Sequence, residues 1–352
     1  MRLLVTGAAG FIGSNFVRLS LDGRTPHVPV ERLVVLDLLT YAGNYANLVD
    51  LEGDARFRFV CGDIADGDAA AALLRDERID VVVNFAAESH VDRSIHDHGP
   101  FLRTNVHGTL ALLDAARAVG SLTRFLQVST DEVYGSVAEG RAAEDWPSEP
   151  SSPYAASKAA ADGFVQAYAT TYRLPAVVTR CSNNYGPYQF PEKLIPLFVT
   201  NALDGKPLPL YGDGLNERDW IHVEDHCRAL WHVLALPDRD GQVYNISAEN
   251  EVPNRQVTDA ILQLAGCSLD LVRYVQDRPG HDRRYALDSS KLRATGWIPR
   301  RSFSEGLAST VVWYREHRAW WEDVKSGAYR EYYAHMYDAR LAGSSADPHR
   351  TG

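Results

Sequence analysis

The sequence predicts an α/β fold in which a doubly wound parallel sheet is followed by a smaller C-terminal α/β lobe. In the first half of the chain, short apolar runs alternate with longer segments of helical pattern. Strands of a parallel sheet are covered by helices on both faces and are therefore apolar throughout. After about Asn183 proline and glycine become frequent and the elements shorten, which indicates a second lobe closing over the carboxyl edge of the sheet.

Six short segments of the first half have the composition of covered strands. Each is rich in valine, leucine or phenylalanine and is apolar on both faces. The six are Leu3–Thr6, Leu33–Asp37, Phe57–Cys61, Val81–Ala87, Phe125–Ser129 and Ala176–Thr179. A further strand, Val243–Ile246, is expected among the short elements of the smaller lobe.

Helical patterns separate these strands. We expect helices over Gly13–Leu21 and Asn105–Val119, the second closed by Gly120, since glycine readily adopts the left-handed conformation found after a helix. A late helix is expected to begin near Ser304, a suitable N-cap, and to run toward Trp320.

Composition and charge exclude several classes of protein. The chain has 352 residues, 45% of them hydrophobic and 23% charged, which suffices for a large core and two lobes. A net charge of −10 without a long lysine and arginine run argues against a nucleic-acid partner. No apolar stretch approaches the roughly 20 residues that span a bilayer, and no signal peptide is seen, so we expect a cytoplasmic protein without a membrane partner. The four scattered cysteines are expected to be reduced thiols.

A glycine-rich turn stands where the first strand meets the first helix. In Thr6-Gly7-Ala8-Ala9-Gly10-Phe11-Ile12-Gly13 the glycines let the backbone turn sharply and approach a pyrophosphate, whose charge the helix N-terminus favours. Alternatively, the glycines only permit tight packing. The strand before and the helix after favour a Rossmann-type dinucleotide site built on Gly7, Gly10, Phe11, Ile12 and Gly13.

Acidic residues follow the next two strands. Asp37 ends the second strand, where a carboxylate accepts hydrogen bonds from both ribose hydroxyls and repels a 2′-phosphate. Leu38 and Leu39 supply no arginine to offset that repulsion, so the predicted cofactor is NAD and not NADP. Asp63 and Ile64 follow the third strand, where the aspartate is placed to bind the adenine amino group.

Tyr154 and Lys158 are four residues apart and therefore lie on one face of a predicted helix. An ammonium group beside a phenol stabilises the phenolate and lowers the phenol pKa, so the pair suits a general base. A tyrosine–lysine pair at this spacing is usually a solvated helix face. Its position after a dinucleotide domain, at a helix start of sequence Ser151-Ser152-Pro153, favours a catalytic role.

Thr130, Asp131 and Glu132 follow the fifth strand, at the edge of a parallel sheet where ligands bind. One of two adjacent acids could serve as a helix N-cap or as a partner of the helix dipole. That explanation hardly covers both acids beside a cofactor site. Since two like charges raise one of the two pKa values, one acid is predicted to stay protonated near neutral pH.

Seven segments share their residue types with one known family. They are Tyr41–Asn44, Ala86–Ser94, Thr130–Gly135, Asn183–Gln189, Pro191–Pro196, Arg218–Trp220 and Asp277–His281. With them the sequence resembles the extended short-chain dehydrogenase/reductase family and, within it, the dTDP-glucose 4,6-dehydratases, over nearly the whole chain up to about Tyr333. The Asp-Glu pair after a threonine separates these dehydratases from related epimerases and decarboxylases. The glycine loop departs slightly, with Ala8-Ala9 where the family often has Gly-Ala.

The resemblance implies a three-stage reaction with tightly bound NAD. Tyr154 takes the proton of the carbon-4 hydroxyl while hydride passes to NAD, with Lys158 supporting the phenolate and Thr130 bonded to the developing carbonyl. Glu132 then removes the carbon-5 proton, and protonated Asp131 gives its proton to the departing carbon-6 hydroxyl. Hydride returns to carbon 6, so dTDP-glucose becomes its 4-keto-6-deoxy derivative, for deoxysugar biosynthesis.

The same resemblance places further residues at the two ligands. Contacts with NAD are implied for Ala86, Ala87, Ser89, Thr104 and Asn184. Contacts with the nucleotide sugar are implied for Ser89, Thr130, Asn183, Lys193, Leu194, Arg218, Asn254, Asp277, Arg278 and His281. Arg218 is the expected diphosphate ligand, since a guanidinium binds phosphate oxygens bidentately. The alternative for Arg218 is a surface ion pair with Glu217 or Asp219.

Domain limits follow from this assignment. Residues 1–182 are predicted to form the NAD-binding domain, to which residues 215–235 return, and residues 183–335 the nucleotide-sugar-binding lobe. Residues 342–352, small and polar, are expected to be disordered. The resemblance also implies a homodimer built on the helix Asn105–Val119 and the helix that carries Tyr154.

Two alternative functions stay open. One is a dehydratase, epimerase or decarboxylase of the same fold acting on another nucleotide sugar, which substrate profiling would identify. The other is a non-catalytic NAD-binding regulator, against which the intact catalytic set argues. His222 and His226 are four residues apart with two acids between them, but those acids are expected at a helix N-terminus and no metal is predicted.

Overall fold

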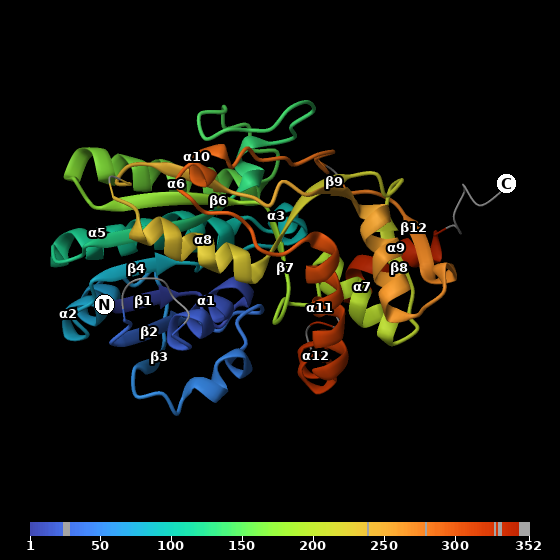
Figure 1. Cartoon of the computed structure of the whole chain (residues 1–352), viewed down its shortest axis with the longest axis horizontal. Coiled ribbons are helices and arrows are strands. Elements are labelled where there is room, and N and C mark those ends of the chain that lie inside the picture. Colours follow the sequence, from blue (N-terminus) through green and yellow to red (C-terminus); the bar gives the residue numbers. More distant parts are fainter. Residues whose placement is uncertain (24–28, 238, 279, 327–328, 330–332, 345–352) are drawn as a thin grey trace.

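A computed structural model describes residues 1–344 except 24–28, 238, 279, 327–328 and 330–332. Figure 1 shows a large sheet with its helices and, beside it, a smaller lobe from the C-terminal half. The large sheet has the strand order β10-β6-β5-β4-β1-β2-β3, and all neighbouring strands are parallel. The predicted doubly wound parallel sheet is confirmed.

The strands of this sheet are close to the predicted ones. They are β1 (Arg2–Thr6), β2 (Arg32–Asp37), β3 (Phe57–Cys61), β4 (Val81–Asn84), β5 (Arg124–Thr130), β6 (Ala176–Cys181) and β10 (Val243–Ile246). β4 ends at Asn84, three residues earlier than predicted, because Asn84 pairs with Thr6 and the neighbouring β1 ends there. The order reverses between β1 and β4, which is the point where open α/β sheets bind ligands.

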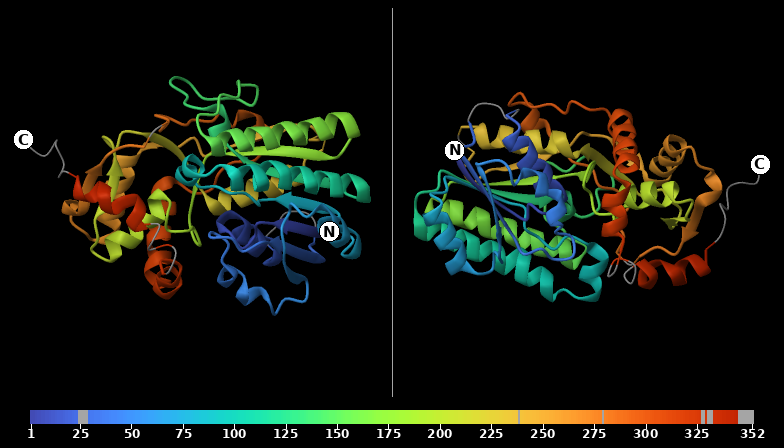
Figure 2. Two further views of the ribbon diagram at one scale, coloured as in Figure 1. Left: turned by 180° about the vertical axis from the view of Figure 1, so that it is seen from behind. Right: turned by 90° about the horizontal axis from the view of Figure 1, so that it is seen from below.

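Helices cover both faces of the sheet, as Figure 2 shows from two sides. On one face Phe16 and Trp231 stack at 5.5 Å between ring centroids, over a core that includes Leu3 and Val5. Leu4, between those two strand residues, packs into the core on the opposite face, as the alternation of a strand requires. The first face carries α1 (Phe11–Leu21) and α8 (Val223–Ala235), and the second carries α2 (Gly67–Asp76), α5 (Thr109–Val119) and α6 (Pro153–Tyr172).

The helix predicted over Asn105–Val119 is longer than expected. Its backbone is helical from Gly99, with α4 (Gly99–Phe101), a π-type stretch over Leu102–Gly108, and then α5. Gly120 closes it with φ of +67°, as predicted. Short helical segments elsewhere are α3 (Val91–His96), α10 (Ser290–Arg293) and the turns Tyr45–Asn47, Val49–Leu51, Asp131–Tyr134 and Leu269–Leu271.

The smaller lobe has its own core and two small sheets. In one sheet β9 lies between β7 and β11, and in the other β8 and β12 are parallel. Its strands are β7 (Asn183–Tyr185), β8 (Leu208–Tyr211), β9 (Glu217–His222), β11 (Glu251–Pro253) and β12 (Val272–Val275). Its helices are α7 (Leu194–Leu203), α9 (Asn254–Ala265), α11 (Phe303–Glu316), α12 (Arg318–Val324) and α14 (Ala339–Ala342), the last after a π-type turn Ala334–Asp338.

The second half of the chain adds a strand to the large sheet that was predicted in the smaller lobe. Val243–Ile246, expected in the smaller lobe, is the edge strand β10, parallel to β6. Its Tyr244 and Ile246 join the same core as α8, so the helix and the strand return together. Residues 217–222, expected to return as well, instead form β9 of the smaller sheet. The two-domain division stays a prediction, with β10 assigned to the large sheet and residues 217–222 to the smaller lobe.

The late helix differs from its prediction at both ends. Ser302, not Ser304, is the N-cap of α11, because Ser302 and Glu305 form a reciprocal capping box. The helix ends before His317, and α12 begins at Arg318. In the tail, Ala342 ends α14, while residues 345–352 lie outside the described residues.

Two further sequence predictions concern side chains and membranes. The four cysteines are free thiols. Within the described residues, the helices are too short or too polar to cross a membrane.

Candidate active site

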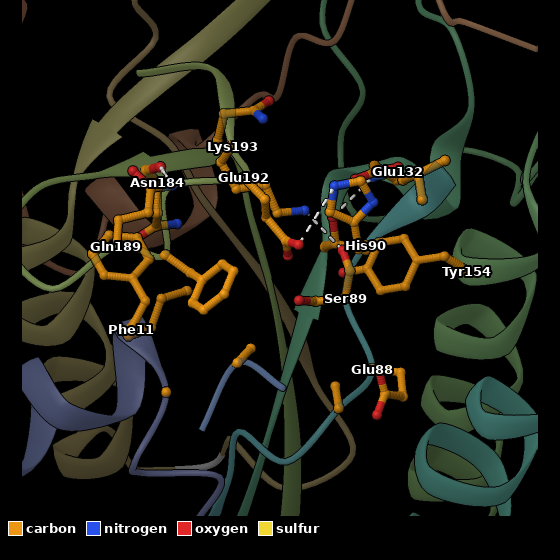
Figure 3. Close-up of a pocket in the computed structure, with 18 of the residues that line it drawn as sticks. Phe11, Glu88, Ser89, His90, Glu132, Tyr154, Asn184, Gln189, Glu192 and Lys193 are labelled. Atoms are coloured by element: carbon orange, nitrogen blue, oxygen red, sulfur yellow. Dashed lines mark hydrogen bonds and ion pairs between the residues drawn. The ribbon is translucent and has the colours of Figure 1, made fainter. Parts of the chain in front are cut away.

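A cavity of about 430 Å³ opens at the carboxyl edge of the large sheet, and side chains of both lobes line it (Figure 3). Its wall includes the glycine loop, the ends of β2, β4 and β5, the start of α6 and parts of the smaller lobe. Every predicted site residue lines this cavity except Asp277. The Asp277 carboxylate is 2.6 Å from Nδ1 of His281, which does line the cavity.

The glycine loop has the shape that a dinucleotide phosphate requires. Gly7 has φ of +65°, and a Cβ on it would approach the Ala86 nitrogen to 2.5 Å. A Cβ on Gly13 would approach the Ala8 Cα to 2.6 Å, so neither position accepts a side chain. No side chain caps the N-terminus of α1 at Gly10, and its first turn contains no acid. The free N–H groups there therefore suit an anionic ligand.

Asp37 lies at the predicted end of β2 and is bound to the glycine loop. Its Oδ2 accepts a hydrogen bond from Ala9 N at 2.8 Å, and its Oδ1 accepts one from Leu39 N at 2.8 Å. Burial raises the pKa of Asp37, against the lowering effect of these two bonds. Asp63 is paired with Arg103 at 2.6 Å, and both Asp63 and Ile64 line the same half of the cavity. These residues fit a bound NAD.

Tyr154 and Lys158 lie on the first turns of α6, which begins at Pro153 with Ser152 as its N-cap. The Lys158 ammonium donates to the Val128 carbonyl at 2.7 Å. The predicted lowering of the Tyr154 pKa by Lys158 is not seen in this arrangement, where the ammonium is bound to the Val128 carbonyl. Burial raises that pKa well above its usual value, and the nearby Glu132 raises it further.

The Asp131–Glu132 pair begins a short 3-10 turn with Thr130 as its N-cap. Thr130 Oγ1 accepts from Glu132 N at 3.3 Å and lies 3.2 Å from Asp131 Oδ1. Burial raises the pKa of Asp131 well above its usual value, and the charge of Glu132 adds to this effect. Burial also raises the pKa of Glu132, but Lys193 and Arg278 oppose it. Of the two acids, Asp131 therefore has the more strongly raised pKa, with burial as the larger cause.

Asp131 also has an oxygen that no protein group satisfies. Its Oδ2 is buried and has no hydrogen-bond partner in the described part of the chain. Asn183 and Asn254 each have a buried Oδ1 in the same state, and all three residues line the cavity. Because an unpaired buried polar atom costs free energy, these atoms suit a polar ligand that would bond them.

Arg218 is buried and does not form the surface ion pair that was its alternative. It donates to the main-chain oxygens of Glu217, at 2.7 Å, and Asp282, at 2.9 Å, and its guanidinium lies 4.3 Å from the Tyr285 ring centroid. The Glu217 carboxylate is instead 3.4 Å from Arg284. Arg218 thus presents a positive charge to the cavity from a fixed position.

The remaining predicted residues are also held by protein contacts. Lys193 donates to Ser89 O at 2.9 Å, just before the start of α7 at Leu194. Asn184 Oδ1 lies 2.8 Å from His226 Nδ1, and Arg278 pairs with Asp92 at 2.9 Å. The lining residues Ala86, Ala87 and Thr104 are on the glycine-loop half.

The structure brings together a largely buried polar cluster to which the sequence assigns no role. His90 and Glu192 face each other in Figure 3 with 3.8 Å between His90 Nε2 and Glu192 Oε2. Arg93 lies 3.6 Å from the same Glu192 oxygen, and its guanidinium is 3.9 Å from the Tyr41 ring centroid. All four belong to the segments that carry the family resemblance. In the sequence, the signal for this cluster was a set of polar side chains placed just after a strand and just before a helix.

Glu192 provides a prediction about stability. Burial raises its pKa from 4.5 to about 7. Between these pH values the folded protein binds a proton that the unfolded chain has released, so this group's contribution to the free energy of unfolding falls as pH rises. The loss amounts to about 3 kcal/mol across the interval. Urea unfolding of wild type and Glu192→Gln at several pH values should show wild type losing this amount relative to the variant. Parallel pH curves would contradict the prediction.

His222 and His226 have protein partners. His222 is the N-cap of α8 and accepts from Glu224 N at 3.2 Å. Glu224 pairs with Arg228 and Arg301. Within the described residues, no group of three or more His, Cys, Asp or Glu side chains is arranged to hold a metal ion.

The chain is similar to known proteins in both sequence and structure. A family model described as GDP-mannose 4,6 dehydratase matches residues 4–310. A dTDP-glucose 4,6-dehydratase of Streptomyces niveus is 52% identical over 327 residues, which are 93% of this chain and 96% of that protein. A crystal structure of a dTDP-glucose 4,6-dehydratase from Streptomyces venezuelae with NAD and TYD bound has a TM-score of 0.90 and 56% identity, covering 92% of this chain and all (100%) of that one.

The same comparison finds enzymes of a related reaction. A UDP-glucose 4-epimerase of Thermus thermophilus, solved in complex with NAD, has a TM-score of 0.81 and 34% identity and covers 90% of this chain and 100% of that one. The fold is thus common to both kinds of enzyme.

Proposed function

The chain belongs to the GDP-mannose 4,6 dehydratase family and, within it, to the dTDP-glucose 4,6-dehydratases, and from this membership we propose its reaction. It is a hydro-lyase that uses NAD to convert dTDP-glucose to dTDP-4-keto-6-deoxyglucose, a step of deoxysugar biosynthesis. One observation carries the proposal: Asp131, which is buried, and the adjacent Glu132, which is partly buried, share one cavity with Tyr154 and Lys158. An epimerase needs the last two residues, and only a dehydratase needs the acid pair.

NAD, when bound along the glycine loop, supplies reversible hydride transfer at carbon 4 and carbon 6 of the sugar. Tyr154 takes the proton of the carbon-4 hydroxyl, and the resulting ketone makes the carbon-5 proton acidic. Thr130, at the end of β5, holds the carbonyl oxygen by a hydrogen bond. Lys158 stabilises the Tyr154 phenolate after the lysine ammonium moves from the Val128 carbonyl to the phenolate oxygen.

Water is then eliminated by the two acids. Lys193 and Arg278 oppose the rise in the pKa of Glu132, so this residue serves as the base that removes the carbon-5 proton. Asp131, protonated because it is buried beside Glu132, donates its proton to the carbon-6 hydroxyl as that group leaves as water. The bound cofactor would supply the hydride for carbon 6, and carbon 5 is reprotonated, so no reducing equivalent would be consumed.

The proposal is tested by incubating purified protein, without added cofactor, with dTDP-glucose, UDP-glucose and GDP-mannose in parallel. The 4-keto-6-deoxy product is followed by its absorbance in alkali and by the mass loss of one water. We expect turnover of dTDP-glucose alone. If no substrate loses water although NAD is bound, the dehydratase assignment is wrong, and inversion at carbon 4 would identify an epimerase.

Arg218 is proposed to bind the diphosphate, because it is the buried guanidinium of the cavity wall that stacks on Tyr285. Arg218→Lys keeps the charge but removes the planar, bidentate donor and the stacking. We expect the KM for dTDP-glucose to rise about tenfold to a hundredfold, the cost of one to two strong hydrogen bonds, with a smaller change in kcat. A KM within twofold of wild type would exclude Arg218 as the diphosphate ligand.

We also propose a homodimer and a cytoplasmic location. Leu102, just before α5, and Phe164 and Tyr172 of α6 are large apolar side chains at least 38% exposed, so a self-complementary pairing of these helices would bury them. The four free cysteines suit a reducing compartment. Light scattering of the purified protein and cell fractionation test the two statements.

A further inference from the structure

We propose that Asn47 and Trp320 are positioning residues that hold the loop of residues 40–47 closed over the dinucleotide, so that NAD stays bound throughout the catalytic cycle. The inference rests on the proposed use of NAD and goes beyond it, since neither residue lines the cavity. The reaction needs such retention, because the hydride that leaves carbon 4 must return to the same substrate molecule at carbon 6.

The loop forms part of the dinucleotide wall. Thr40, Ala42 and Gly43 line the cavity together with Asp37 and the glycine loop. Gly43 is in close contact with Asp37, since a Cβ on Gly43 would approach Asp37 Oδ1 to 2.9 Å. A dinucleotide bound along the glycine loop therefore cannot leave on this side unless the loop moves.

Asn47 fastens the end of this loop to the glycine loop. Its Nδ2 donates to the Ala9 carbonyl at 2.8 Å, and the same carbonyl accepts from Asn44 N at 3.0 Å. Asn47 is only 2% exposed, so water does not compete for these bonds. The loop is thereby attached to the turn that receives the phosphates.

Trp320 connects the same amide to the smaller lobe. The indole Nε1 donates to Asn47 Oδ1 at 2.9 Å, across 273 positions of the sequence. Trp320 belongs to α12, the lower red helix of Figure 1. The side-chain amide of Asn47 thus donates through its nitrogen to the glycine loop and accepts through its oxygen from the smaller lobe. Opening of the loop must break both hydrogen bonds.

Aromatic packing fixes the position of Trp320. Its ring centroid lies 5.2 Å from that of Trp313 and 5.8 Å from that of Tyr188. Arg18 of α1 packs on the Tyr188 ring, with its guanidinium 4.6 Å from the ring centroid. The same guanidinium donates to the Asn47 main-chain carbonyl at 2.6 Å. The indole N–H is therefore held toward Asn47 by a rigid support, which lowers the entropy cost of that hydrogen bond.

Trp320→Phe tests the inference, because it removes one N–H and retains an aromatic ring. Holoprotein is freed of unbound nucleotide, and NAD release is followed into an excess of an NAD-consuming enzyme, with no sugar present. We expect release about five to ten times faster than in wild type, the effect of one net hydrogen bond. Activity measured without added NAD should fall faster after dilution and return when NAD is supplied.

Trp146→Phe is the matched control, since it makes the same chemical change at a tryptophan that is 41% exposed and lies outside the aromatic cluster around Trp320. It should release NAD at the wild-type rate. In an Asn47→Leu background, which lacks both side-chain bonds, Trp320→Phe should cause no further acceleration. Wild-type release from Trp320→Phe, or equal acceleration by Trp146→Phe, overturns the inference. Because release is measured without sugar, neither result depends on whether dTDP-glucose is the substrate.

Discussion

Replacing Tyr154 with phenylalanine is expected to lower kcat for dTDP-glucose by about 10³-fold, the middle of the range that a general base contributes. The proposed first stage requires a group that accepts the carbon-4 hydroxyl proton, and oxidation cannot start without it. The Tyr154 ring packs against Phe101 with 6.3 Å between centroids, and phenylalanine preserves this contact. The loss should therefore appear in kcat, while the free energy of unfolding stays near that of wild type.

Steady-state assays with saturating dTDP-glucose measure this effect, and the amount of NAD that copurifies serves as its internal control. A Tyr154→Phe protein that retains NAD and is within tenfold of wild type would remove the tyrosine from the role of base. Tyr172, the exposed tyrosine at the end of the same helix, supplies the matched control. Tyr172→Phe should leave kcat unchanged.

Replacing Glu132 with glutamine is expected to slow water loss by about 10²-fold to 10⁴-fold and to separate the stages of the reaction. The ketone at carbon 4 still forms, because Tyr154 is intact, but the carbon-5 proton has no base to receive it. The absorbance of reduced nicotinamide should therefore rise after substrate is added and persist. In wild type the same signal should be transient, since hydride returns to carbon 6.

Rapid mixing with absorbance detection follows the reduced nicotinamide, and mass spectrometry of the quenched sugar follows water loss. If Glu132→Gln loses oxidation and dehydration together, the residue acts earlier than elimination. Glu139, an exposed glutamate on the segment that follows the same turn, is the control. Glu139→Gln should behave as wild type in both measurements.

Predictions that depend on nearby residues in the sequence were accurate in position. The glycine loop lies between β1 and α1, and Asp37 ends β2, because the local hydrophobic pattern marks where each element begins and ends. Tyr154 and Lys158 share one face of α6, since the helical repeat fixes residues four apart. What these residues do in catalysis stays a prediction until the variants are measured.

Predictions that depend on packing between distant segments were incomplete. The strand at Val243–Ile246 could be recognised by composition, but its pairing partner is decided by the return of α8 to the sheet. The pKa of Tyr154 is expected from the sequence to fall and is raised instead, because burial and the nearby Glu132 raise it and the Lys158 ammonium is bound to the Val128 carbonyl.

The sequence by itself determined the fold class, the dinucleotide loop, the acid pair and the tyrosine–lysine pair, because each depends on short spacings and on the periodicity of one strand or helix. Only the tertiary structure decided that His90 meets Glu192, that Arg218 is buried against Tyr285, and that Asn47 bonds Trp320. Such contacts join segments that are far apart in the chain. Their partners are selected by the shape and burial of the whole core, which no local pattern encodes.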